Sequence, residues 1–171
     1  MPRIAIATTE EVSTAARPLL DGVQKMIGFV PNLFQTLAHA PSVLSGYLQL
    51  SQTLSRGTLG AREREQIALA VSELNGCDYC LAAHGYFSAK AGLSDGEIQA
   101  ARAGELDALT RVARQVAENR GALDDAQLAT ARAAGISDAK LIEVVAQVAL
   151  MTLTNYLNNL ARTDVDFPPA Q

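Results

Sequence analysis

The sequence predicts an all-α protein, and three observations lead to this prediction. Apolar residues recur at intervals of three and four along every long segment, the spacing of one face of a helix. No segment alternates apolar and polar residues over the length of a strand, and none has the glycine-rich loop that binds nucleotide phosphates. Hydrophobic residues make up 49% of the chain, with 6 prolines and no tryptophan, which suits a compact helical protein. A length of 171 residues suits one domain over 1–171 with its own core.

The first helices are predicted from proline and glycine positions. We expect one helix to begin at 9–12, with acidic residues in its first turn, and to end near Gly28. Pro31 and Pro41 each stand where a further helix begins. His39 falls in the join between these two helices, where a lone histidine is more often solvated or capping than a ligand, so we assign it no role.

The middle of the chain reads as a helical hairpin. A helix over 58–74 carries a core-facing apolar stripe and ends at the Asn75-Gly76 break. The next helix contains both cysteines and stops at Gly92. A capping box then follows over 94–97.

The last third of the chain continues the helical pattern. Amphipathic helices are expected over 98–103, 106–119 and 124–134. Ser137 with its neighbouring aspartate caps a final helix that is apolar nearly all round as far as Leu160. Such a helix is expected to lie at the centre of the fold or in a subunit contact.

Charge and hydropathy exclude some classes of partner and location. The net charge is −4 and no basic run is longer than two residues, so nucleic acid and anionic membranes are not expected partners. The longest apolar region, 144–153, is interrupted by polar residues and falls short of the ~20 residues that span a bilayer. We expect a soluble protein without an export signal. Two closely spaced cysteines in such a chain fit a reducing compartment, and we expect the cytoplasm.

The candidate reactive residues lie within one window of eight residues, which contains Cys77, Cys80 and His84. On a helix that turns about 100° per residue, these three side chains fall within roughly 60° of arc. Residues three apart on a helix have Cα atoms on the order of 5–6 Å apart, so the two cysteines can form a disulfide. The positive end of the helix near the Asn75-Gly76 break favours thiolates, and His84 can exchange protons near neutral pH.

These three residues leave several interpretations open. Two cysteines and a histidine with a carboxylate would suit zinc, although structural zinc sites usually take their second ligand pair from a separate element. They would also suit a buried core, because free cysteine is among the most buried residue types. Redox chemistry of a dithiol is the interpretation that we favour.

With Glu65 included, the spacing Glu65-x11-Cys77-x2-Cys80-x3-His84 resembles the signature of the alkylhydroperoxidase AhpD family within the carboxymuconolactone decarboxylase-like superfamily. The likeness extends over about 28–93, the core motif region, and the segments 154–159 and 166–168 look like the peroxidase-related branch. Residues 94–135 add little to it.

This resemblance implies an AhpD-like bundle of helices that forms a homo-oligomer, a trimer or hexamer, and reduces hydroperoxides in antioxidant defence without haem or metal. It implies that Cys80 is the peroxidatic thiolate, that Cys77 resolves the sulfenic acid to a redox-active disulfide, and that Glu65 and His84 form a proton relay. The implied partners are a hydroperoxide and a dithiol or protein reductant.

Several other side chains and functions compete with this scheme. Glu73 is nearer to the cysteines in sequence than Glu65 and is the rival carboxylate. Tyr79 and Tyr86 are expected to pack, and a phenol with a reference pKa of about 10 is a poor base at neutral pH. The intact dithiol argues against lactone decarboxylation. A dithiol-disulfide oxidoreductase or redox sensor and a metal-binding structural oligomer remain the alternatives.

Overall fold

The computed structural model describes residues 1–8 and 10–168, and over these residues the chain forms nine α-helices and no strand. This confirms the all-α prediction. In chain order the helices are α1 (Arg17–Ile27), α2 (Asn32–Leu37), α3 (Pro41–Leu54), α4 (Ala61–Leu74), α5 (Asp78–Lys90), α6 (Asp95–Ala103), α7 (Ala108–Glu118), α8 (Asp125–Ala133) and α9 (Asp138–Ala161).

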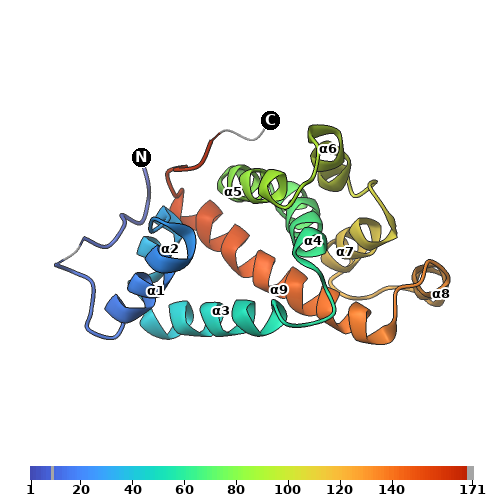
Figure 1. Ribbon diagram of the computed structural model, residues 1–171, viewed down its shortest axis with the longest axis horizontal. Coiled ribbons are helices and arrows are strands. Elements are labelled where there is room, and N and C mark those ends of the chain that lie inside the picture. Colours follow the sequence, from blue (N-terminus) through green and yellow to red (C-terminus); the bar gives the residue numbers. More distant parts are fainter. Residues whose placement is uncertain (9, 169–171) are drawn as a thin grey trace.

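The last helix, α9, crosses the molecule and organises the packing of the others. Figure 1 shows it as a long diagonal, with α1, α2 and α3 along one side and α4 to α8 toward the other. Helices α2, α3, α4, α5 and α7 all contact α9, which confirms its expected central place. Within the described part of the chain, no helix is both long and apolar enough to cross a bilayer.

The first helix begins at Arg17 and not over 9–12 as predicted, and Thr9 lies outside the described residues. Pro18 stands in the first turn of α1, where the missing N–H of proline has no helical partner to lose. A helix starting at 9–12 would have placed Pro18 in its interior, where the proline ring clashes with the carbonyl four residues before it. The sequence therefore carried the signal for the later start.

The other helix boundaries follow their caps. Ser94 and Ser137 cap α6 and α9 as predicted, and each hydroxyl accepts the N–H of the residue three positions later. Helix α7 begins later than the predicted 106 because Asp107 is its cap, and the Asp107 carboxylate accepts the N–H of Thr110 at 2.8 Å. Asparagine and aspartate compete with helical hydrogen bonding and therefore favour such cap positions.

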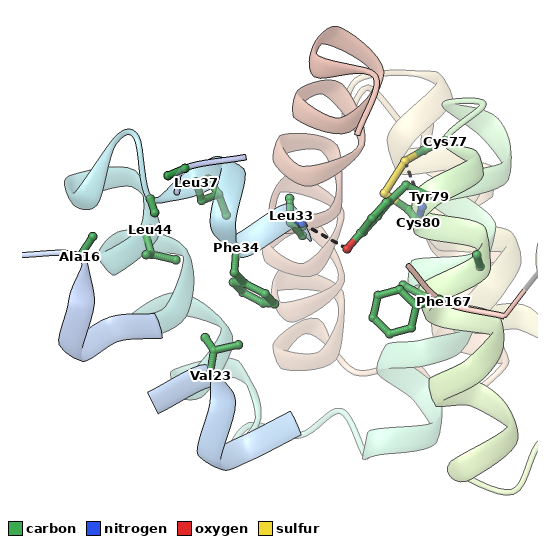
Figure 2. Close-up of a cluster of buried hydrophobic side chains, with 14 residues drawn as sticks. Ala16, Val23, Leu33, Phe34, Leu37, Leu44, Cys77, Tyr79, Cys80 and Phe167 are labelled. Carbon is green, nitrogen blue, oxygen red and sulfur yellow. Dashed lines mark hydrogen bonds between the residues drawn. A yellow bond between two sulfur atoms is a disulfide. The ribbon is translucent and has the colours of Figure 1, made fainter. Parts of the chain in front are cut away.

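Buried side chains form two main clusters. One joins α1, α2, α3 and α5, and Figure 2 shows Val23, Phe34 and Leu44 on one side of it, facing the cysteine helix. Val23 and Leu44 are completely buried, and burying a side chain of this kind is worth about 1.5–3 kcal/mol. The second cluster joins α4, α7, α8 and α9 around Ile67 and Met151. Helices α4 and α5 therefore lie with the first cluster on one side and the second on the other.

Candidate active site

The turn between α4 and α5 sets the position of the two cysteines. Gly76 has φ +58°, a left-handed conformation that glycine adopts without steric strain. The chain reverses there, so that α4 and α5 pack against each other as a hairpin. Cys77 is the N-cap of α5, and its Sγ accepts the backbone N–H of Cys80 at 3.2 Å. Cys77 and Cys80 thus lie at the positive end of the α5 dipole.

Cys77 and Cys80 form a disulfide, with their Cα atoms 5.3 Å apart. Both residues are buried, with exposed fractions of 0% and 3%, and the bond lies inside the cluster seen in Figure 2. The side chain of Asn158 reaches this bond from α9, and its Nδ2 donates to Cys80 Sγ at 3.3 Å. Asn158 Oδ1 is buried without a hydrogen-bond partner among the described residues. The amide is thus turned toward Cys80 alone.

The histidine and one of the two candidate carboxylates meet across the hairpin. His84 Nδ1 lies 2.8 Å from Glu65 Oε2, and both side chains are about four-fifths buried. His84 is one helical turn beyond Cys80 on α5, so their Cβ atoms lie about 5–6 Å apart. The rival carboxylate, Glu73, instead pairs with Arg102 of α6 at 2.6 Å. The structure therefore joins Glu65, and not Glu73, to the histidine.

A cavity of about 460 Å³ opens beside this pair. Its wall includes the polar side chains of Glu65, His84, Arg64, Lys90 and Gln147. Apolar side chains from α1, α2, α3, α9 and the C-terminal segment form most of the remainder, among them Ile27, Leu33, Phe34, Leu48, Leu150 and Phe167. Ligand-binding clefts for small molecules are typically about 300–1,000 Å³ and mostly apolar. The cavity thus has the size and lining for an organic molecule next to an acid–base pair.

Two tyrosines in the wall of the cavity stay protonated. Burial, with a smaller contribution from the charge of Glu65, raises the pKa of Tyr47 to about 12. Burial also raises the pKa of Tyr79 well above its usual value, and the charge of Asp166 adds to this effect. Neither phenol can act as a base near neutral pH.

Tyr79, between the two cysteines, connects the cysteine helix to the C-terminal segment. Its hydroxyl donates to Asp166 Oδ1 at 2.9 Å and accepts the N–H of Leu33 at 3.2 Å, the second contact being drawn in Figure 2. Phe167 packs edge-on against the Tyr79 ring with 5.9 Å between centroids. Tyr79 is a packing residue, as predicted, and its contacts hold the chain end over the site.

Sequence reasoning missed the polar side chains that α9 brings to the site. Gln147, Asn155 and Asn158 are all buried, and they fall within about 80° of arc at 100° per residue. The available signal was three amides spaced along one face of a largely apolar helix. Asn155 donates to Ser72 of α4 at 3.1 Å, whereas Gln147 and Asn158 each have a buried amide oxygen without a partner among the described residues.

The zinc interpretation finds no support in the described residues, where no group of three or more His, Cys, Asp or Glu side chains is arranged to hold a metal ion. His84 is paired with Glu65, and the two sulfurs are bonded to each other. The two cysteines instead form a disulfide next to the hydrogen-bonded pair of His84 and Glu65.

Comparison with known proteins places this arrangement among related folds. Residues 41–119 match the carboxymuconolactone decarboxylase family. The match therefore begins later and ends later than the region about 28–93 expected from the sequence. No curated protein sequence gave a match.

Solved structures resemble the whole fold. A peroxidase-related protein from Ralstonia eutropha JMP134, described as an alkylhydroperoxidase AhpD core, has a TM-score of 0.84 at 24% identity over 96% of this chain and 92% of its own. A peroxidase-related protein from Silicibacter sp. TM1040 has a TM-score of 0.79 at 20% identity, covering 95% and 93%. The debrominase Bmp8 has a TM-score of 0.74 at 18% identity, covering 95% and 91%. These likenesses also include the segment 94–135, which had added little to the resemblance in sequence.

Proposed function

We propose that this chain, whose residues 41–119 match the carboxymuconolactone decarboxylase family and whose fold is similar to that of an AhpD core protein, is a thiol-dependent hydroperoxide reductase. One observation carries the proposal. The hydrogen-bonded pair of Glu65 and His84 stands one helical turn from a Cys77–Cys80 dithiol and beside an apolar cavity. Redox couple, proton relay and organic binding site are thereby adjacent.

In the first step, the Cys80 thiolate attacks the terminal oxygen of the hydroperoxide and the O–O bond breaks. The sulfur is oxidised to a sulfenic acid, and the other oxygen leaves as an alkoxide, a strong base that needs a proton. His84 gives this proton. Glu65 accepts a hydrogen bond from His84 Nδ1 and thereby holds the ring in one orientation before and after the transfer. The Asn158 amide donor favours the sulfur in its anionic form.

In the second step, the Cys77 sulfur attacks the Cys80 sulfenic acid and water leaves. The reaction consumes one hydroperoxide and two thiols and yields one alcohol, one water and the Cys77–Cys80 disulfide, which is the bond present in the structure. An external dithiol or protein reductant then returns the two thiols. Antioxidant defence is the corresponding role.

The test is to mix reduced protein with cumene hydroperoxide and to titrate thiols and alcohol together. We expect two thiols lost per chain and one cumyl alcohol formed. Cys80→Ser should abolish peroxide consumption, whereas Cys77→Ser should react once and leave a sulfenic acid that dimedone labels. Labelling of Cys77 in the Cys80→Ser variant, with Cys80 inert in the Cys77→Ser variant, would reverse the two roles.

A dithiol-disulfide oxidoreductase without peroxide turnover is the second candidate, because the disulfide at a helix start suits exchange as well. It predicts that cumene hydroperoxide leaves the thiols intact while a disulfide-bonded partner oxidises them. The apolar cavity beside Glu65 and His84 favours the peroxidase, since exchange between proteins needs no binding site for a small organic molecule.

A further inference from the structure

We propose that the cavity selects hydroperoxides with an apolar body and a carboxylate, and that Arg64 and Lys90 bind the carboxylate while Gln147 accepts a hydrogen bond from the reacting O–H group. This inference rests on the proposed function and names its substrate class. It combines three features of one cavity: its apolar volume, two cations without carboxylate partners, and a buried amide oxygen without a donor.

The volume argues for an organic substrate rather than hydrogen peroxide. The cavity holds about 460 Å³, whereas one water molecule occupies about 30 Å³ of liquid. Hydrogen peroxide would leave most of the apolar wall facing water. An alkyl chain or ring covers that wall, and each CH₂ group removed from water strengthens binding.

The two cations point to an anionic group on the substrate. Arg64 and Lys90 both line the cavity, and none of the ion pairs among the described residues includes either of them. Arg64 donates to the carbonyl of Leu59, and Lys90 lies 4.3 Å from the ring centre of Tyr86. Glu65, the carboxylate in the same wall, is paired with His84. A carboxylate brought by the ligand would supply the missing partner.

Gln147 supplies a further polar contact inside the cavity. Gln147 is 6% exposed and lines the cavity, and its Oε1 is buried without a hydrogen-bond partner among the described residues. A buried acceptor left unpaired destabilises a protein. A hydroperoxide or alcohol O–H would satisfy this oxygen, and both groups occur during the proposed reaction.

The hairpin orders these groups along the cavity. On α5, His84 lies one turn beyond Cys80 and Lys90 lies six residues further, about 9 Å along the helix. Arg64 is next to Glu65 near the start of α4, the helix end that lies away from the cysteine turn. A substrate with its peroxide at His84 therefore has its carboxylate toward Lys90 and Arg64. The spacing suits a medium-chain hydroperoxy acid.

The test measures binding without redox chemistry, using the oxidised protein with decanoate and 1-decanol in a calorimeter. We expect decanoate to bind at least tenfold more tightly than decanol. Added salt should weaken the binding of decanoate but not the binding of decanol. The variant Arg64→Gln/Lys90→Gln should reduce the preference to less than twofold. The control Arg111→Gln/Arg132→Gln removes two exposed charges outside the cavity and should leave the preference for decanoate unchanged. Equal affinities, no decanoate binding, or the same loss in the control would overturn the inference.

A second variant tests the amide. Gln147→Leu should weaken binding of cumyl alcohol about fivefold relative to cumene, the effect of one neutral hydrogen bond. An unchanged ratio would remove Gln147 from the scheme. Because neither ligand contains a peroxide and the disulfide stays closed, these results are independent of thiol oxidation by cumene hydroperoxide. The proposed substrate class can therefore be contradicted while the proposed peroxidase activity is supported, or the reverse.

Discussion

Hydrogen bonds to single atoms decide which protonation states the site can hold. His84 Nδ1 is engaged by Glu65, which leaves Nε2 to exchange a proton with substrate or thiol. The Cys80 sulfur accepts from the Asn158 amide, and the Cys77 sulfur accepts from a backbone N–H at the helix start. Each sulfur thus accepts a hydrogen bond from its own donor. The donor to Cys80 is a side chain and can be removed by substitution, whereas the donor to Cys77 is a backbone N–H.

His84→Ala and Glu65→Gln should each slow peroxide reduction by on the order of 10² to 10⁴, the usual contribution of a positioned acid or base. If the pair acts as one relay, the double variant should be little slower than either single variant. Stopped-flow rates with cumene hydroperoxide measure all three. Glu73→Gln is the matched control, because Glu73 pairs with Arg102, and it should react at the normal rate. Multiplicative losses in the double variant would mean two independent roles.

Asn158→Leu should shift the pH profile of Cys80 alkylation upward by about 1–2 pH units. A hydrogen bond to a charged group is worth about 1.5–3 kcal/mol, and one pH unit corresponds to 1.36 kcal/mol. Iodoacetamide rates in the Cys77→Ser background report Cys80 alone. The control is Asn159→Leu, since Asn159 is exposed and donates to the carbonyl of Asn75. Equal profiles for the two variants would show that Asn158 does not act on the sulfur.

Between helices, the start of α4 is held by a carboxylate of α9. Glu143 accepts the backbone N–H of Thr58 at 2.8 Å and of Leu59 at 3.1 Å. The carboxylate also lies against Gly57, so closely that a side chain there would collide with it. This contact positions the helix that carries Glu65. The hydrogen bonds from Thr58, and secondarily from Leu59, lower the pKa of Glu143.

The lowered pKa gives this contact a defined pH dependence. A carboxylate whose pKa is depressed by folding adds stability above its unfolded pKa, and the addition is lost as the pH falls through the folded value. At pH 7, Glu143→Gln should lower Tm by about 1–2 °C, a small shift because water screens the charge of this largely solvated carboxylate. The Tm values of the wild type and Glu143→Gln should converge as the pH falls below 4.5, the ordinary pKa of a glutamate carboxyl. A difference that persists unchanged at pH 3 would assign the effect to packing.

At the scale of the whole molecule, an apolar stripe on the outer side of α9 is not covered by any other part of the described chain. Its large side chains fall within about 80° of arc at 100° per residue. They are Ile142, Val145, Leu153, Tyr156 and Leu160, all exposed. Monomers seldom expose contiguous apolar patches of this kind, so we expect a second copy of the chain to cover it.

Sedimentation at micromolar concentration should therefore show a homo-oligomer rather than an 18.1 kDa species. Leu153→Glu/Tyr156→Glu places two charges on the stripe and should dissociate the oligomer while leaving the helical circular dichroism intact. Val43→Glu introduces a charge at an exposed apolar residue of α3 and should leave the assembly unchanged. A wild-type profile with monomer alone would contradict the prediction.

Local sequence was sufficient wherever the interacting residues are close along the chain. Helix spacing and the caps at Ser94 and Ser137 depend on neighbours within a few residues, and so they were predicted correctly. Cys77, Cys80 and His84 share a face of α5 for the same reason. The late start of α1 is equally local, since Pro18 marks it. The prediction of a start over 9–12 was wrong because acidic residues are typical of a first turn but do not outweigh a proline that cannot stand in a helix interior.

Contacts between distant segments required the folded chain. Glu65 and Glu73 both lie on α4, and which of them meets His84 depends on how α5 folds back and on Arg102 of α6, which binds the other. Asn158 reaches Cys80 from 78 residues away. Gln147, Arg64 and Lys90 come from three different helices to one cavity. Periodicity reports which face of a helix is apolar, but it carries no information about the partner of that face, because packing between helices is set by the whole arrangement of side chains.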